Sequence, residues 1–354
     1  MRMLSTVDAM ATLLTIGSTV AQDAPSFEEV LEGARQEGKL TALIYIPAKP
    51  ETHRALIEAF NERFGLNTEV EWTPTHPVVS VQRVITEAAA GDVSVDVLFG
   101  SPQEVQVALQ AGVVSPYPWS TVFGDEMPKV RDVEETLFGA DKIITLRSFA
   151  GVWGIAWNPN LIADGDVPNN YTDFANPDWS GKFSFNSFFA PHDALVDLIG
   201  YKGTIDLAKR IIENKPIFAR GAAAVAQDVS NGVATFGWTF AHEAAVAAKL
   251  GQPIQFKLAA DYIPVVYGQV IVPDDAPHPN TARLFAAWLA AEGYKISEQF
   301  EQISAPADPE SAATKMIEEA VARGAQISTL RSEQDIALSA EARTEITSML
   351  TDVQ

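Results

Sequence analysis

The chain has 354 residues, of which 47% are hydrophobic, and its formal net charge is -21. A chain of this length exceeds the size at which one hydrophobic core keeps growing, so two domains are expected. The acidic balance argues against a nucleic-acid partner, because phosphate binding needs clustered lysine and arginine. The lack of cysteine excludes disulfides, thiolate metal sites and cysteine nucleophiles.

The N-terminus indicates export. Arg2 precedes a mostly apolar stretch at residues 9–20, and small residues stand near Ala21, where a signal peptidase would cut. We therefore expect residues 1–21 to be a signal peptide and the mature protein to be periplasmic and soluble; a frayed cytosolic N-terminus is the alternative. No later apolar run reaches the roughly 18 residues that a membrane span requires.

Three pairs of a strand and a helix follow. Ser26 and Glu29 predict a capping box for a helix that Gly38 ends. Strands are then predicted at residues 39–47, 67–74 and 95–102, and a helix follows each of them. This alternation predicts an α/β lobe with right-handed crossovers. Residues 115–142 are rich in proline, aromatic and charged residues, and no firm element is predicted there.

Two extended stretches, residues 143–162 and 262–275, divide the chain. Both are rich in β-branched and aromatic residues, and the first closes on the turn formers Asn158, Pro159 and Asn160. We expect lobe 1 to comprise residues 22–147 and 268–305 and lobe 2 residues 148–267, with C-terminal helices in residues 306–354 packed on lobe 2. Two lobes joined by two extended crossings leave a cleft that can close on a ligand by hinge motion, so a binding protein is predicted.

A two-lobed hydrolase or transferase is the competing class. The sequence contains no GxSxG elbow, P-loop or GxGxxG motif. Carboxylates are abundant, but catalysis also needs a perturbed group in the cleft with an oriented partner, and no candidate stands out. We therefore expect no enzymatic activity. A sensory role, in which the closed form docks on a receptor, would use the same cleft.

Six segments carry a family resemblance through their order and spacing. They are ALIYIPAKPE (42–51), DVLFGSP (96–102), IAWNPNLI (155–162), NPDWSGKFSF (176–185), NGVATFGWTFAHEA (231–244) and HPNTARLFAAWLAAEGYKISEQF (278–300). Over roughly residues 26–310 the chain resembles the solute-binding proteins of ABC importers, in the bacterial extracellular family that includes ferric-ion-binding proteins. The resemblance implies a type II periplasmic-binding-protein fold, a ligand held between the lobes and delivery to a membrane permease. A monomer is expected.

The resemblance does not identify the ligand. Ferric-binding relatives carry adjacent tyrosines just after the strand that here leads to Thr239, Phe240 and Ala241. Fe(III) needs anionic oxygen ligands, and phenylalanine offers none, so iron held by tyrosinate is not expected. His76 and Glu51 are isolated donors and form no ligand set. We expect no metal and no cofactor, and ferric ion remains the alternative ligand.

The cleft should be built from loops at the carboxyl ends of the strands, where helix starts present free N–H groups. Arg220 is the strongest candidate, because its planar guanidinium suits a carboxylate, phosphonate or phosphate group. A surface ion pair is the alternative for Arg220, a helix cap for Asn186 and Ser187, and core packing for each aromatic residue. Arg147, at the first crossing, is expected to form a hinge ion pair, and a second donor to the anion is the alternative. The predicted ligand-binding residues are Ala48, Lys49, Trp72, His76, Gly100, Ser101, Asn186, Ser187, Phe188, Arg220, Gly221, Ala222, Trp238, Thr239, Phe240, Tyr262 and Tyr267. The predicted ligand is a small organic anion.

Overall fold

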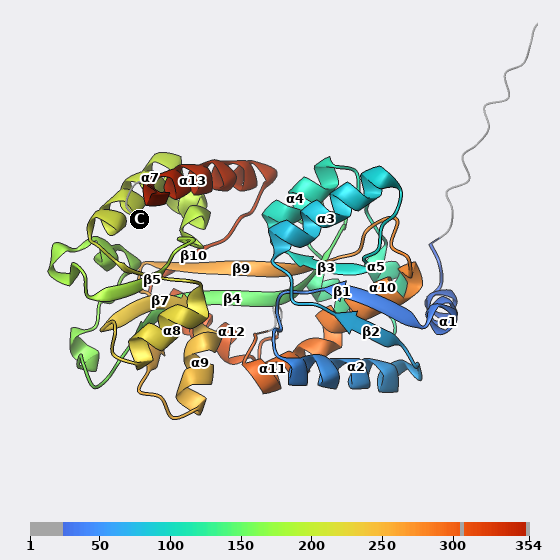
Figure 1. Ribbon diagram of the computed structural model, residues 1–354, viewed down its shortest axis with the longest axis horizontal. Coiled ribbons are helices and arrows are strands. Elements are labelled where there is room, and N and C mark those ends of the chain that lie inside the picture. The colour runs from blue at the N-terminus through green and yellow to red at the C-terminus, as the bar shows by residue number, and fades with distance from the viewer. Residues whose placement is uncertain (1–23, 305–307, 352–354) are drawn as a thin grey trace, which may run out of the picture.

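The computed structural model describes residues 24–304 and 308–351. The predicted signal peptide lies outside these residues. Figure 1 shows two bodies side by side, joined by two long strands that run through both. Within the described residues, no helix combines the length and the apolar character that crossing a membrane would require.

Lobe 1 contains a parallel sheet in the order β2-β1-β3, covered by helices on both faces. Its N-terminal helix starts as predicted, with a capping box between Ser26 and Glu29, and ends at Gly38 with φ 59°. One apolar core packs α1, α2 and α10 on one face of the sheet, and a second packs α3 and α4 on the other. The elements are α1 Phe27–Glu37, β1 Lys39–Leu43, α2 Pro50–Phe64, β2 Glu69–Trp72, α3 Pro77–Ala90, β3 Val97–Gly100, α4 Pro102–Gln110, α5 Trp119–Phe123, α6 Val130–Val133, α10 Pro279–Trp288, a π-helix η5 at Leu289–Gly293 and α11 Tyr294–Glu301.

Lobe 2 repeats this arrangement with strands in the order β7-β5-β6, all parallel. Its main core is rich in aromatic residues, and α7 covers it, while α8 and α9 cover the opposite face. The elements are the 3-10 helices η1 Asp164–Asp166, η2 Tyr171–Ala175, η3 Pro177–Trp179 and η4 His192–Leu195, with β5 Phe183–Asn186, α7 Val196–Glu213, β6 Ile217–Ala219, α8 Ala222–Ser230, β7 Phe236–Phe240, α9 Ala241–Lys249 and β8 Gln255–Lys257.

The two predicted crossings are the antiparallel strands β4 (Leu146–Trp157) and β9 (Tyr262–Ile271). The end of β9 pairs with β3 of lobe 1, and the second half of β4 pairs with β7 of lobe 2. One sheet therefore runs through both lobes. The predicted fold class, two α/β lobes joined by two extended crossings, is confirmed; the boundary residues of the lobes stay a prediction.

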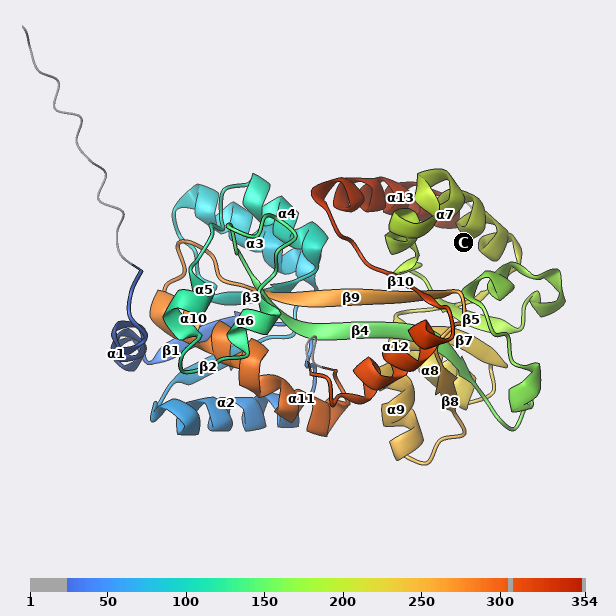
Figure 2. The ribbon, with the colours of Figure 1, turned by 180° about the vertical axis from the view of Figure 1, so that it is seen from behind.

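The C-terminal segment lies beside the crossings. It consists of α12 (Ala312–Ala322), β10 (Gln326–Ser328) and α13 (Glu333–Thr351). Strand β10 pairs with the start of β9, and α13 packs mainly against α7 of lobe 2 but also contacts α4 of lobe 1. In Figure 2, which shows the molecule from behind, β10 and α12 lie in front of the two crossing strands.

Candidate ligand-binding cleft

The carboxyl ends of the parallel strands of the two lobes point toward each other, and the loops that follow them enclose a cavity. This α8 cavity has a volume of about 340 Å³. Its lining comprises Tyr45, Ile46, Ala48, Lys49, Glu301 and Ile303 of lobe 1 and Arg220, Gly221, Ala222, Ala223, Phe240, His242, Glu243 and Val246 of lobe 2. It is therefore an interlobe cavity, as a hinge-closing binding protein requires.

The start of α8 forms the lobe 2 wall of this cavity. Gly221 is its N-cap residue, with φ 88° and ψ 171°, and no side chain caps the helix. The Thr239 hydroxyl donates a 2.7 Å hydrogen bond to the Ala222 carbonyl and so fixes the helix start to β7. The first N–H groups of a helix have no partner within it, so they are available to a ligand anion. Arg220 stands beside them, exposed, and it forms no ion pair with any described residue.

The start of α2 forms the lobe 1 wall, but an acidic side chain of the protein already occupies it. The Glu301 carboxylate accepts hydrogen bonds from the backbone N–H groups of Ala48 (3.1 Å) and Lys49 (3.0 Å). Glu301 is only 7% exposed. In this conformation these two N–H groups are therefore bonded within the protein, while Ala48 and Lys49 still line the cavity and stay predicted ligand-binding residues.

A second and smaller interlobe cavity, the α13 cavity, has a volume of about 130 Å³. Its lining comprises Ser101, Pro102 and Gln103 of lobe 1, Trp153, Val265, Val266 and Tyr267 of the crossings, and Ala190, Pro191, Asp193, Ala194, Phe240, Thr329, Leu330 and Arg343. The Trp153 indole N–H is buried without a partner among the described residues. Burial raises the pKa of Tyr267, so its phenol stays a neutral donor.

Phe240 belongs to the walls of both cavities. Its ring lies 4.0 Å from the Trp153 ring, measured between centroids. A Cβ atom at Gly151 would come within 2.5 Å of the Phe240 ring, so the crossing strand carries glycine where this ring packs. Phe240 therefore lies between the α8 cavity and the α13 cavity. Ferric-binding relatives are expected to carry a tyrosine near this position.

The structure brings eight of the predicted residues together. Ala48, Lys49, Arg220, Gly221, Ala222 and Phe240 line the α8 cavity, and Ser101, Phe240 and Tyr267 line the α13 cavity. His76 and Phe188 come from opposite lobes and face each other, with ring centroids 6.4 Å apart. Neither residue lines the α8 or the α13 cavity, so their role in ligand binding stays a prediction.

Other predicted residues serve the fold. Trp238 and Thr239 are fully buried, and the Asn186 amide accepts from the N–H and donates to the carbonyl of Ala190. Trp72 stacks on His53 and donates to the Ile44 carbonyl. Gly100 is buried at the end of β3. The backbone N–H of Ser187 donates to the Ala219 carbonyl, and Tyr262 packs on the lobe 2 core. We correct the assignment of Trp238, Thr239 and Asn186, because buried or internally bonded groups cannot reach a ligand here.

Arg147 adopts neither predicted role. Its guanidinium donates a 2.8 Å hydrogen bond to the Asp132 carbonyl and lies 5.2 Å from the centre of the Tyr267 ring. No ion pair of Arg147 occurs among residues 24–304 and 308–351. It therefore supports the crossing strands from the lobe 1 side.

Sequence reasoning missed several residues of the cleft. Glu301 is one, because it lies at the end of α11, far along the chain from the loops that it contacts. Glu243 and His242 are others, and the His242 Nε2 atom lies 3.5 Å from a Glu243 carboxylate oxygen. Asp193 and Arg343 of the α13 cavity form a 2.8 Å pair. Their positions depend on tertiary packing, and no local motif indicates them.

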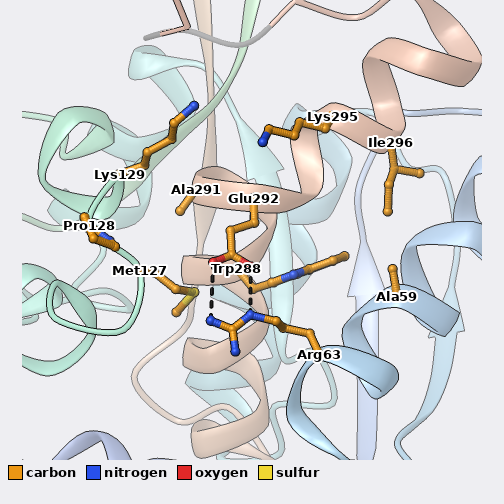
Figure 3. A pocket seen from close by; sticks show the side chains of 10 residues that line it. All are labelled: Ala59, Arg63, Met127, Pro128, Lys129, Trp288, Ala291, Glu292, Lys295 and Ile296. Carbon is orange, nitrogen blue, oxygen red and sulfur yellow. Dashed lines mark hydrogen bonds and ion pairs between the residues drawn. The ribbon is translucent and has the colours of Figure 1, made fainter.

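A larger cavity of about 530 Å³ lies within lobe 1, away from the cleft (Figure 3). Arg63 and Glu292 pair across its floor, at 3.1 Å. All of its lining residues belong to lobe 1, so hinge motion would not close it. Among the described residues, no group of three or more histidine and acidic side chains is placed to hold a metal ion.

The backbone of Gly221 leads to a prediction. Its φ and ψ fall in a region that only glycine adopts readily, so Gly221→Ala should lower the free energy of unfolding by about 1 to 2 kcal/mol. Denaturation with urea measures this loss. The matched control is Gly165→Ala, a position without positive φ and with open space around its Cβ, where little change is expected. Equal stabilities of the two variants would contradict the assigned backbone.

Comparisons with known proteins agree with this geometry. Residues 47–296 match the family model of bacterial extracellular solute-binding proteins. An uncharacterized protein of Haemophilus influenzae is 22% identical over 275 residues, which are 75% of this chain and 76% of that protein.

Solved structures share the fold over most of the chain. Iron-bound HitA from Pseudomonas aeruginosa superimposes with a TM-score of 0.68 at 18% identity, covering 89% of this chain and 99% of that one. The Atu4243-GABA receptor gives 0.66 at 16% identity (88% and 96% covered), and the substrate-binding protein of an ABC transporter from Agrobacterium tumefaciens gives 0.67 at 16% identity (90% and 96% covered). Since the family model spans most of the chain and these neighbours are two-lobed binding proteins, the chain belongs to the bacterial extracellular solute-binding proteins and has the type II periplasmic-binding-protein fold.

Proposed function

We propose that this protein is the substrate-binding component of an ABC importer, and that it captures a small organic anion in the α8 cavity by lobe closure. One observation carries the ligand class: Arg220, without an ion-pair partner among the described residues, stands beside the uncapped start of α8 inside an interlobe cavity. A guanidinium and free helix N–H groups together suit a carboxylate, phosphonate or phosphate ester. Lys49 faces them from lobe 1 and adds a second positive charge.

The family match supports the rest of the proposal: the protein is exported to the periplasm and delivers its ligand to a permease in the inner membrane. We also propose that it acts as a monomer. Its neighbours include the Atu4243-GABA receptor, and because GABA carries a carboxylate group, this supports an organic ligand. We propose a carrier and not an enzyme, because the family and its neighbours are transport proteins.

Ferric ion is the second candidate, favoured by the iron-bound neighbour. Two features oppose it. The α8 cavity has Phe240 where a tyrosinate would be needed, and Glu301, one of its two acidic residues, is already bound to two backbone N–H groups. A ferric complex that brings its own carboxylates, such as ferric citrate, would be recognised through those carboxylates and would depend on Arg220.

A thermal-shift screen tests the proposal. The panel contains carboxylates, phosphonates, sugar phosphates, polyamines and ferric citrate, and citrate alone is the control for the iron complex. We expect stabilisation by one class of organic anion. A shift given only by polyamines, or by ferric citrate but not by citrate, would overturn the ligand class. Turnover of any hit would overturn the assignment as a carrier.

A further inference from the structure

The C-terminal helix α13 belongs to the cores of both lobes. Near its start, Ile336 is 1% exposed and packs in the apolar core of lobe 1 that also contains Val105 and Ala108 of α4. Near its end, Ile346 and Leu350 pack in the aromatic core of lobe 2. Figure 1 shows α13 reaching from α7 toward α4 above the crossing strands. The chain therefore links the two lobes a third time, through side-chain packing.

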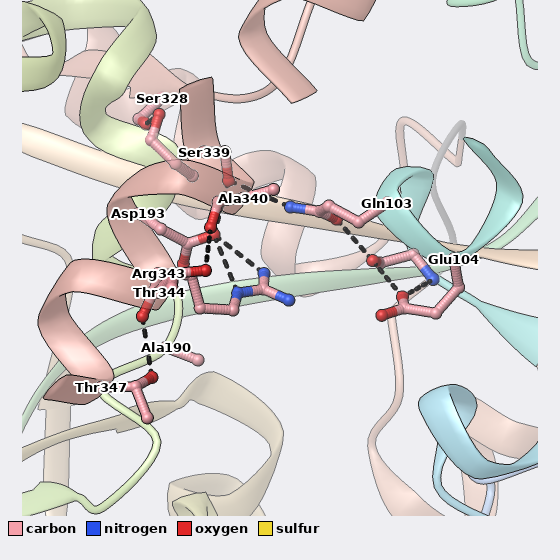
Figure 4. A network of polar contacts seen from close by, with 12 residues as sticks. Gln103, Glu104, Ala190, Asp193, Ser328, Ser339, Ala340, Arg343, Thr344 and Thr347 are labelled. Atoms are coloured by element: carbon pink, nitrogen blue, oxygen red, sulfur yellow. Dashed lines mark hydrogen bonds and ion pairs between the residues drawn. The ribbon is translucent and has the colours of Figure 1, made fainter. Parts of the chain in front are cut away.

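A chain of polar contacts lies at the same junction (Figure 4). The Gln103 side-chain amide of lobe 1 donates to the Ser339 hydroxyl of α13 at 3.1 Å. Ser339 in turn donates to the Asp193 carboxylate at 2.5 Å. The Arg343 guanidinium donates to the same carboxylate oxygen at 3.2 and 2.8 Å. Asp193 is only 3% exposed, so these hydrogen bonds compensate a buried charge.

The attachment to lobe 2 is the stronger of the two. Asp193 accepts hydrogen bonds from two residues of α13, Ser339 and Arg343. Strand β10, which precedes α13 in the chain, pairs with the crossing strand β9. Ser328 of β10 also donates to the Ala194 carbonyl at 2.8 Å. On the lobe 1 side the contacts are the Gln103 hydrogen bond and the packing of Ile336 with its neighbour Leu330. When the lobes separate, α13 should therefore stay on lobe 2 and leave lobe 1.

We propose that α13 is a latch that holds the lobes together and sets how readily the cleft opens. Opening by the hinge must break the Gln103–Ser339 hydrogen bond and withdraw Ile336 from the lobe 1 core. Arg343 and Leu330 also line the α13 cavity, so a ligand that reaches this cavity would touch the latch. The helix α13 lies outside residues 47–296, which the family model matches.

The test measures lobe separation without added ligand, so its result is independent of the ligand class proposed above. The chain has no cysteine, and Gln82→Cys on α3 with Lys209→Cys on α7 places one label on each lobe at exposed positions. Pulsed electron-spin distance measurements then report the populations of closed and open molecules. In the labelled parent we expect the short distance to dominate.

Two variants weaken the lobe 1 side of the latch. Gln103→Ala should raise the ratio of open to closed molecules about threefold to tenfold, and Ile336→Ala about tenfold or more. Thr347→Ala is the control, because its hydroxyl bonds only to the Arg343 carbonyl of its own helix. Circular dichroism confirms that each variant is folded; should Ile336→Ala unfold, the half-buried Gln103 still provides the test. Distance distributions that are the same in Gln103→Ala and the control would overturn the latch.

Discussion

Arg220→Ala is expected to weaken binding of the organic anion about tenfold to a hundredfold, because the ligand loses charge-assisted hydrogen bonds inside a cavity. The folded state should be unaffected, since Arg220 is exposed and forms no ion pair among the described residues. Isothermal titration calorimetry with the best hit of the screen measures the loss.

Two further variants make this result specific. Arg220→Lys keeps the charge but loses the planar fork, so its affinity should lie between those of the parent and the alanine variant. Arg210→Ala removes an exposed arginine of α7 outside both interlobe cavities and should bind like the parent. Equal dissociation constants for Arg220→Ala and Arg210→Ala would exclude Arg220 from the site.

The second large effect concerns His192, which is buried at the start of η4. Its Nε2 donates to the Thr204 carbonyl at 2.7 Å, so Nδ1 is the acceptor for the Tyr171 hydroxyl at 2.5 Å, and the neutral imidazole satisfies both. Burial lowers the pKa of His192 from 6.5 to about 4, opposed by the Thr204 hydrogen bond and the neighbouring Asp193. The unfolded chain therefore binds a proton at a higher pH than the folded chain does. The neutral His192 therefore contributes its full stabilisation above pH 6.5. The free energy of unfolding falls by about 3 kcal/mol as the pH drops from there to 4.

His192→Gln isolates the pH-dependent contribution of His192 to the free energy of unfolding, since glutamine can donate to Thr204 and accept from Tyr171 without titrating. The variant should be less stable than the parent at pH 7.5. The difference between their free energies of unfolding should shrink by about 3 kcal/mol between pH 7 and pH 4, as urea denaturation at each pH would show. A difference that is constant with pH would mean that His192 is not the titrating group.

The fold could be predicted where local patterns and tertiary packing agree. The Ser26 cap and the two crossings appear where the sequence places them. Gly200 has φ 67° and kinks α7, a conformation that glycine adopts readily. The π-helix Leu289–Gly293 lies between α10 and α11, and no local sequence pattern indicates it. Strand β10 was missed because three residues carry no pattern of their own and depend on pairing with β9.

The only guide to the site in the sequence was the rule that ligands bind at the loops that follow the carboxyl ends of parallel strands. That rule found Arg220, Gly221 and Ser101. It could not distinguish an amide group free for a ligand from one already bonded, as Asn186 and the α2 start show. It also had no means of finding Glu301 or Arg343, which reach the cleft from helices distant in sequence.

The most direct measurement is a crystal structure of the protein with the best hit of the screen bound. We predict that the anionic group of the ligand lies between the lobes, within hydrogen-bond distance of the Arg220 guanidinium and the first N–H groups of α8. A ligand found outside the interlobe cleft, or one held without Arg220 and the start of α8, would contradict the proposed binding site.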